Sequence, residues 1–326
     1  MQVRTTSGTA MGPFFALLGV VVFFAIADNL QEHGGHFVSL RNAQNVVVQS
    51  ATVAVAALGM TVIIVAGGID LSVGTGMALC AVVLAWFLQH DYSPWLATSA
   101  GILTGCLIGF LNGLLITSLR VVPFIVTLGT MTIFLGLAKL IGQNRTIRPT
   151  PEQVPDWMKQ LLNPRVEQSW MLFPPGVWIL LLLAVGAVLL LHYTVLGSYL
   201  KAIGGNEQAA RFSGIPISAT RLAVYTIAGF TVGVAGLLMF ARLSSANPTS
   251  GTGKELLVIA SVIIGGASLN GGRGSIVGTL IGALIMQVIS NGCTALRLQD
   301  PIQEIVIGTV IVTAVAVDQL RQRRKG

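Results

Sequence analysis

The sequence predicts an all-α polytopic membrane protein with about ten transmembrane helices, within a range of about eight to ten. The first observation is composition: of the 326 residues, 53% are hydrophobic and 10% are charged, and the mean hydropathy is +0.80. Soluble chains carry about 25% charged residues. Second, polar breaks divide the chain into apolar runs of about 20 residues, the length that crosses a bilayer. Third, the basic residues behind the net charge of +7 lie between these runs and form no soluble cluster, which argues against nucleic-acid binding.

The expected helices follow these apolar runs and belong to a single domain that covers residues 1–326. Their approximate ranges are 12–30, 46–67, 71–89, 96–118, 122–142, 175–193, 221–241, 255–269, 275–292 and 302–318. The third and eighth are short, and the second and third form either two helices or one broken segment.

The first run ends in Ala25-Ile26-Ala27, a small-residue pattern that a signal peptidase could cleave. Only Arg4 is basic before this run, and the run is long enough to span a membrane. We therefore expect a retained first helix.

The second and third runs meet at residues 67–74, which read G-G-I-D-L-S-V-G. A glycine-rich break inside a membrane is tolerated only where its backbone groups find partners within the protein. Asp70 is the only acid between Glu32 and Asp91, and a carboxylate at such a position is a candidate functional group. We favour a capping role, in which Asp70 or Ser72 accepts hydrogen bonds from N–H groups that open the third helix. A proton-transfer role for Asp70 is the alternative.

Glycine stripes lie along three of the expected helices, with a spacing of four residues in the fourth and the ninth. Such stripes allow close backbone packing between membrane helices, where lipid provides no hydrophobic driving force. They comprise Gly101, Gly105, Gly109 and Gly113 in the fourth helix, Gly229, Gly233 and Gly236 in the seventh, and Gly274, Gly278 and Gly282 in the ninth.

The charge distribution predicts that both termini are cytoplasmic. With an inside N-terminus, the inside loops hold ten of the 19 basic residues and two of the 12 acidic residues, as the positive-inside rule requires. Two loops exceed turn length. Residues 143–174 then form a proline-rich outer (periplasmic) loop, a tether or a small cap, and residues 194–220 form an inner loop.

The inner loop contains the sequence features of a short, self-capped helix. Asn206 is a good N-cap, Glu207 complements the positive helix start, and Arg211 lies near the C-terminal end. Gly214 and then Pro216 end the helix, giving about eight residues or roughly 12 Å. From capping and charge alone, an interfacial connector and a strut that docks into another protein remain equally open.

Motifs for other chemistry are incomplete. Lys254 follows a glycine, but Pro248 and Glu255 break the P-loop pattern at both ends. We expect no metal site, although His33 and His36 lie close together, and no cofactor. The three cysteines fit neither a disulfide framework nor a zinc site. The sequence also lacks a nucleophile–base pair, so we do not expect an enzyme.

Four stretches resemble the ribose-type permeases of bacterial ABC sugar importers. They are residues 59–74, residues 123–130 (P-F-I-V-T-L-G-T), residues 202–215, and residues 264–275, which include I-G-G-A-S-L and G-G-R-G-S. They recur in the family's order from Asn42 to the end, so the resemblance covers most of the chain. Branched-chain amino acid permeases are relatives, but the 67–74 motif is not expected in them.

The resemblance implies a type II ABC-importer-like permease fold, with its broken helix at Gly67, Gly68, Asp70, Ser72 and Gly74. It implies import of a monosaccharide (ribose-, xylose- or galactose-like) or a related polyol across the bacterial inner membrane by ATP-driven alternating access. The implied partners are cytoplasmic ABC ATPase subunits, a periplasmic sugar-binding protein, and a second permease subunit, identical or different.

Two sets of site residues come from this resemblance. The ATPase-coupling helix comprises Gly205, Asn206, Glu207, Ala209, Ala210, Arg211, Ser213 and Gly214, and the residues lining or abutting the pathway are Pro123, Phe124 and Thr127. Two alternatives stay open: a secondary transporter that uses Asp70 as a proton or cation site, and an ABC permease for a non-sugar small polar solute.

Overall fold

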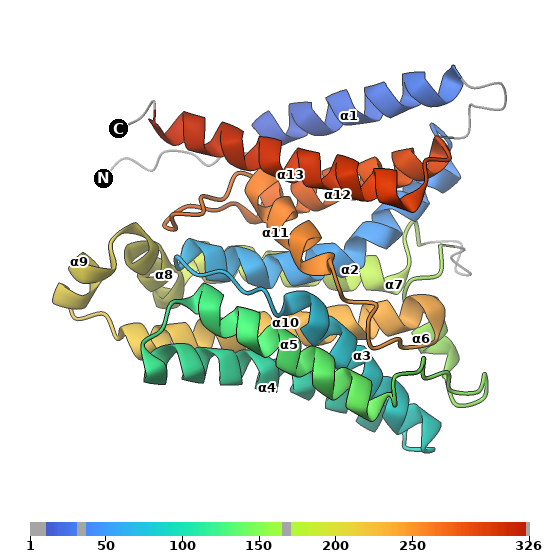
Figure 1. Ribbon diagram of the computed structural model, residues 1–326, viewed down its shortest axis with the longest axis horizontal. Helices are drawn as coiled ribbons and strands as arrows, with labels where there is room; N and C mark the ends of the chain where they lie inside the picture. Colours follow the sequence, from blue (N-terminus) through green and yellow to red (C-terminus); the bar gives the residue numbers. More distant parts are fainter. Residues whose placement is uncertain (1–10, 31–36, 165–170, 324–326) are drawn as a thin grey trace.

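The computed structural model describes residues 11–30, 37–164 and 171–323, with side chains as far as residue 316, and this part of the chain contains thirteen helices. In chain order they are α1 (Met11–Asn29), α2 (Leu40–Val65), α3 (Val73–Gln89), α4 (Pro94–Leu119), α5 (Pro123–Ile141), α6 (Asp156–Gln160), α7 (Pro175–Tyr193), α8 (Val195–Gly205), α9 (Glu207–Phe212), α10 (Ile217–Leu243), α11 (Lys254–Ile264), α12 (Ile276–Ala295) and α13 (Asp300–Arg323) (Figure 1). Among the described residues the only β-pairing is an isolated bridge between Ile147 and Ala246.

The all-α membrane fold is confirmed. Seven helices in the described part are long and apolar enough to cross a membrane, namely α1, α2, α4, α5, α7, α10 and α12, and α3 is a shorter apolar helix. Each of the ten expected helices has a counterpart. Two helices were not expected: α6, within the 143–174 loop, and α8, which precedes the predicted loop helix.

The central helix is α2. Of its most apolar 18-residue window, 89% is buried, against 33% for α4, 22% for α5 and 28% for α7. Figure 1 shows α2 crossing the middle of the bundle, with α1, α12 and α13 on one side and α4, α5 and α10 on the other. Ser39 accepts a hydrogen bond from the N–H of Asn42 at 3.2 Å. This N-cap explains why α2 begins before the expected residue 46.

α2 and α11 end with the same C-terminal motif. After α2, Gly67 adopts φ +80° and the N–H of Gly68 donates to Ile63 O at 3.0 Å. After α11, Gly266 adopts φ +91° and the N–H of Ala267 donates to Val262 O at 3.1 Å. A left-handed glycine with this back-bond terminates a helix. The expected helix 255–269 was therefore too long, because the apolar run continues through the glycines while the helix stops.

Two non-helical stretches lead into the bundle from opposite ends. Residues 66–72, here named the return segment, lead from the end of α2 to the start of α3, and residues 244–253 lead from the end of α10 to the start of α11 (Figure 1). The second stretch reaches the start of α3, where a Cβ on Gly251 would overlap the carbonyl oxygen of Gly74. Only glycine allows this approach.

α4 and α10 pack backbone to backbone. A Cβ on Gly105 would overlap the carbonyl oxygen of Gly229, and one on Gly109 would overlap that of Tyr225. Similarly, Gly278 of α12 lies against the backbone of Gly265, beside the end of α11, and Gly282 lies against that of Ser261 in α11. The glycine stripes thus lie where helices approach most closely.

Candidate functional site

α8 and α9 project from one end of the bundle, between α7 and α10 (Figure 1). The side chain of Asn206 accepts a hydrogen bond from the N–H of Ala209 at 2.9 Å, so Asn206 is the N-cap of α9, as predicted. Gly214 adopts φ +79°, and the N–H of Ile215 donates to Ala210 O at 3.1 Å. Both ends of the helix are therefore capped by local bonds, although α9 has six residues and not about eight.

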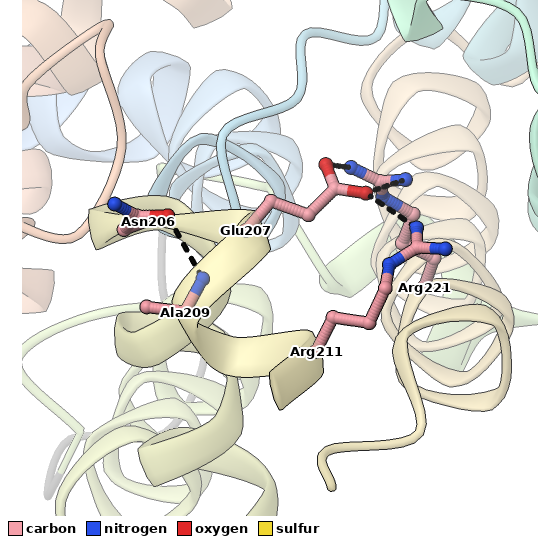
Figure 2. A network of polar contacts seen from close by, with 5 residues as sticks. All are labelled: Asn206, Glu207, Ala209, Arg211 and Arg221. Carbon is pink, nitrogen blue, oxygen red and sulfur yellow. Dashed lines mark hydrogen bonds and ion pairs between the residues drawn. The ribbon is translucent and has the colours of Figure 1, made fainter. Parts of the chain in front are cut away.

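Glu207 joins α9 to α10. Its Oε2 lies 2.6 Å from Nη2 of Arg221, and its Oε1 lies 3.3 Å from Nη1 of the same guanidinium. Arg211 adds a contact to Oε1 at 3.3 Å, and Figure 2 shows both arginines turned toward the carboxylate. A two-point contact between guanidinium and carboxylate fixes orientation as well as distance. From the sequence, Glu207 was expected only to complement the positive start of the helix, and its pairing with Arg221, which lies beyond the Gly214 turn, was not expected.

One side of α9 faces the bundle and the other faces outward. Ala210 is 3% exposed and packs with Ile203 and Ile217. Phe212 is 91% exposed and borders an open hollow lined by Glu207, Gln208 and Arg211 as well. Aromatic residues and arginine are enriched at protein–protein contacts.

Two other motif regions meet the base of this loop. Gly204, near the end of α8, lies against Val65 O and Gly272 N so closely that a Cβ would overlap both. The N–H of Gly272 donates to Val65 O at 2.9 Å. Gly271 lies against Gly204 and Gly67. The end of α2, the end of α8 and the loop after α11 are thus joined at one point.

Asp70 is buried and bonds to the residue before α3. Its Oδ1 accepts hydrogen bonds from the N–H of Ser72 at 2.8 Å and from the Ser72 hydroxyl at 2.6 Å. Asn112 Nδ2 in turn donates to Ser72 Oγ at 2.8 Å. The capping prediction is therefore confirmed for Asp70, which accepts the N–H of Ser72, the N-cap residue of α3, and is wrong for Ser72, whose side chain makes no cap bond. Ser72 has a helical backbone conformation, and its hydroxyl is already used by Asp70.

Thr127 of α5 fastens the return segment. Its hydroxyl accepts from the N–H of Leu71 at 3.1 Å and donates to Ile69 O at 3.2 Å, and the side chain is fully buried. These bonds satisfy the N–H of Leu71 and the carbonyl of Ile69, two backbone groups that lie between helices. Phe124, the second residue of α5, is 46% exposed. That Pro123, Phe124 and Thr127 line or abut a pathway remains a prediction.

Within the described ranges, no group of three or more metal-binding side chains occurs. His33 and His36 lie outside the described residues. The thiols Cys80, Cys106 and Cys293 are free.

Comparison with known proteins gives consistent matches. The family described as branched-chain amino acid transport system / permease component matches residues 42–315. The ribose import permease protein RbsC of Escherichia coli (strain K12) is 37% identical over 307 residues, 94% of this chain and 94% of that protein. RbsC of Bacillus subtilis (strain 168) is 38% identical, covering 95% and 92%. The fructose import permease protein FrcC of Rhizobium meliloti is 34% identical, covering 88% and 80%.

Among solved structures, one described as an inward-facing metal-chelate type ABC transporter aligns with a TM-score of 0.48 and 16% identity. The alignment covers 94% of this chain and 98% of that chain.

Proposed function

Since the chain belongs to the family of permease components matched at residues 42–315, we propose that it is the membrane subunit of an ABC importer for a monosaccharide or a related polyol. The printed names of its relatives support the substrate class: ribose, fructose and D-allose permeases are 33–38% identical over 80% or more of both chains. The chain is the permease component and not the ATPase.

We assign α9 to the contact with the ATPase. The observation that most supports this assignment is the exposed Phe212 on a helix that is capped at both ends. The coupling set is Gly205, Asn206, Glu207, Ala209, Ala210, Arg211, Ser213 and Gly214. The local caps keep α9 helical, and the bonds from Glu207 to Arg221 hold it in one orientation relative to α10. Such rigidity favours a mechanical contact, because an ordered helix loses little conformational entropy on docking.

The partners and orientation follow from this assignment. The α9 end of the bundle faces the cytoplasm, together with both termini, and the membrane is the bacterial inner membrane. Two ATPase subunits dock at the α9 ends of two permease subunits, and a periplasmic sugar-binding protein delivers the solute at the opposite face. ATP-driven closure of the ATPases displaces α9, and the Glu207–Arg221 pair passes this displacement to α10.

Two other functions are separable by experiment. A secondary transporter would need a cation or proton gradient and no ATP. A permease for a different small polar solute would need ATP but would not transport sugars.

The test is uptake by proteoliposomes that contain this chain, its ATPase and its binding protein, with labelled ribose, fructose and allose offered singly. We expect uptake of one sugar that requires internal ATP. Phe212→Ala should weaken ATPase assembly at least tenfold, whereas Tyr193→Ala, 80% exposed at the same end of the bundle, should not. Gradient-driven uptake without ATP, or full assembly of Phe212→Ala, would contradict the proposal.

A further inference from the structure

Two buried polar groups near Asp70 lack partners. Among the described residues, Asn112 Oδ1 and Tyr225 Oη are buried side-chain atoms without a hydrogen-bond partner in the protein. Asn112 is 0% exposed and Tyr225 is 2% exposed. Most buried polar groups in proteins are satisfied by protein or by water.

Both groups lie beside the same carboxylate. The amide of Asn112 faces Asp70 and donates to Ser72 Oγ. Tyr225 Oη lies next to Gly68, two residues before Asp70, where a Cβ would be 2.7 Å away, and Tyr225 packs against Gly109 and Gly113, which flank Asn112 in α4. Asp70, Asn112 and Tyr225 therefore surround one small region between the return segment, α4 and α10.

The bonds around Ser72 fix the orientation of the Asn112 amide. The Ser72 hydroxyl donates its proton to Asp70, so it has only an acceptor left for Asn112. The amide nitrogen of Asn112 must therefore face Ser72, and its carbonyl oxygen points elsewhere and needs a donor. Tyr225 has the opposite need, because its O–H requires an acceptor.

We infer that one structural water occupies this region. It accepts the O–H of Tyr225 and donates its two protons to Asn112 Oδ1 and to the carboxylate of Asp70. Three hydrogen bonds are the usual number for a buried water. The water joins α10 to the hydrogen-bonded chain that already links α4 with the return segment.

A monovalent cation fits the same region less well. The protons of Ser72 and Asn112 already occupy Asp70 Oδ1 and Ser72 Oγ, which leaves few oxygens to coordinate an ion. A cation would also leave the phenolic proton of Tyr225 without an acceptor. Water matches both the donor and the acceptors.

Thermal unfolding of the purified full chain in detergent provides one test. With the water, Tyr225→Phe removes a satisfied hydrogen bond, and we expect the melting temperature to fall by about 1–3 °C. Without it, the same change removes an unsatisfied hydroxyl, so an unchanged or raised melting temperature would overturn the inference. Tyr193→Phe, at an exposed position, is the matched control and should have no effect.

Two further measurements distinguish the water from a direct bond to Tyr225 and from a bound cation. A structure of the transporter at a resolution that shows water should contain density within hydrogen-bond distance of Tyr225 Oη, Asn112 Oδ1 and Asp70, and this density should be lost in Tyr225→Phe. A direct bond from Tyr225 to either residue would overturn the inference. So would a melting temperature that rises when sodium replaces choline at constant ionic strength and loses this response in Asp70→Asn. None of these readouts depends on transport.

Discussion

The guanidinium of Arg221 holds the carboxylate of Glu207 by two contacts, at 2.6 and 3.3 Å, across the turn that separates α9 from α10. Their side chains are 22% and 38% exposed, respectively. The pair is the charged connection between the proposed coupling helix and a helix that crosses the bundle. Its position makes it the first residue pair to test for the transmission of movement from α9 to α10.

Breaking this pair should impair coupling more than folding. For Glu207→Gln and Arg221→Gln we expect uptake to fall several-fold while the melting temperature changes little, because partly exposed ion pairs add little stability. The double exchange Glu207→Arg with Arg221→Glu should recover part of the uptake. The measurement is uptake per ATP hydrolysed in proteoliposomes.

Lys201→Gln on the neighbouring α8 is the control, because Lys201 is exposed and takes part in no ion pair among the described residues. Equal loss in Lys201→Gln and Arg221→Gln would show that the link to α10 has no special role.

Replacing Thr127 should loosen the return segment. Thr127→Val keeps the shape of the side chain but leaves the N–H of Leu71 and the carbonyl of Ile69 without this partner, at a cost of about 1–3 kcal/mol per unsatisfied group. Thr127→Ser should restore most of the stability. Thermal unfolding in detergent measures both.

Thr132→Val on the same helix is the matched control, because Thr132 is exposed and bonds only within α5. If Thr127→Val were as stable as Thr132→Val, the two bonds to the return segment would be unimportant.

The glycine contact between α4 and α10 should not tolerate a methyl group. Gly109→Ala places a Cβ on the carbonyl of Tyr225, and overpacking of this kind costs about 1–3 kcal/mol. We expect a lower melting temperature and less monodisperse protein. Gly129→Ala on α5, where no atom lies within 4 Å of the added Cβ, should be neutral or slightly stabilising. Equal effects at both positions would contradict the close packing of α4 on α10.

Asp70 should be replaceable by an isosteric acceptor. Asp70→Asn retains an oxygen for the N–H and hydroxyl of Ser72, so we expect most uptake to remain, whereas Asp70→Leu should abolish it. Equal loss in both variants would instead indicate that transport needs the charge, as a cation-coupled transporter would. Uptake at matched expression in the membrane distinguishes the outcomes.

Local signals in the sequence predicted much of this architecture. The apolar runs located the ten expected helices, and Asn206 identified the start of α9, because helix length and capping depend on neighbouring residues. α8 was missed: three of its 11 residues are glycines, which lower helix propensity. The end of α11 was placed too late because hydropathy does not register the left-handed turn at Gly266.

Contacts between distant segments could not be read from the chain. No periodicity pairs Glu207 with Arg221, Thr127 with the return segment, or Gly204 with Gly272. The cap expected from Ser72 is missing for the same reason, since its hydroxyl donates to Asp70 and accepts from Asn112 of α4. Such choices depend on which side chains the tertiary fold brings together.

The contact of Gly105 and Gly109 with α10 has a mechanical consequence. A joint made of backbone atoms has no rotamers to rearrange, so α4 and α10 should tilt as a single lever. With 27 residues, α10 is roughly 40 Å long. If α10 tilted by roughly 5° about its end near Arg221, its far end would therefore move by roughly 3 Å. A small displacement at one membrane surface would thus reach the other surface through stiff geometry alone.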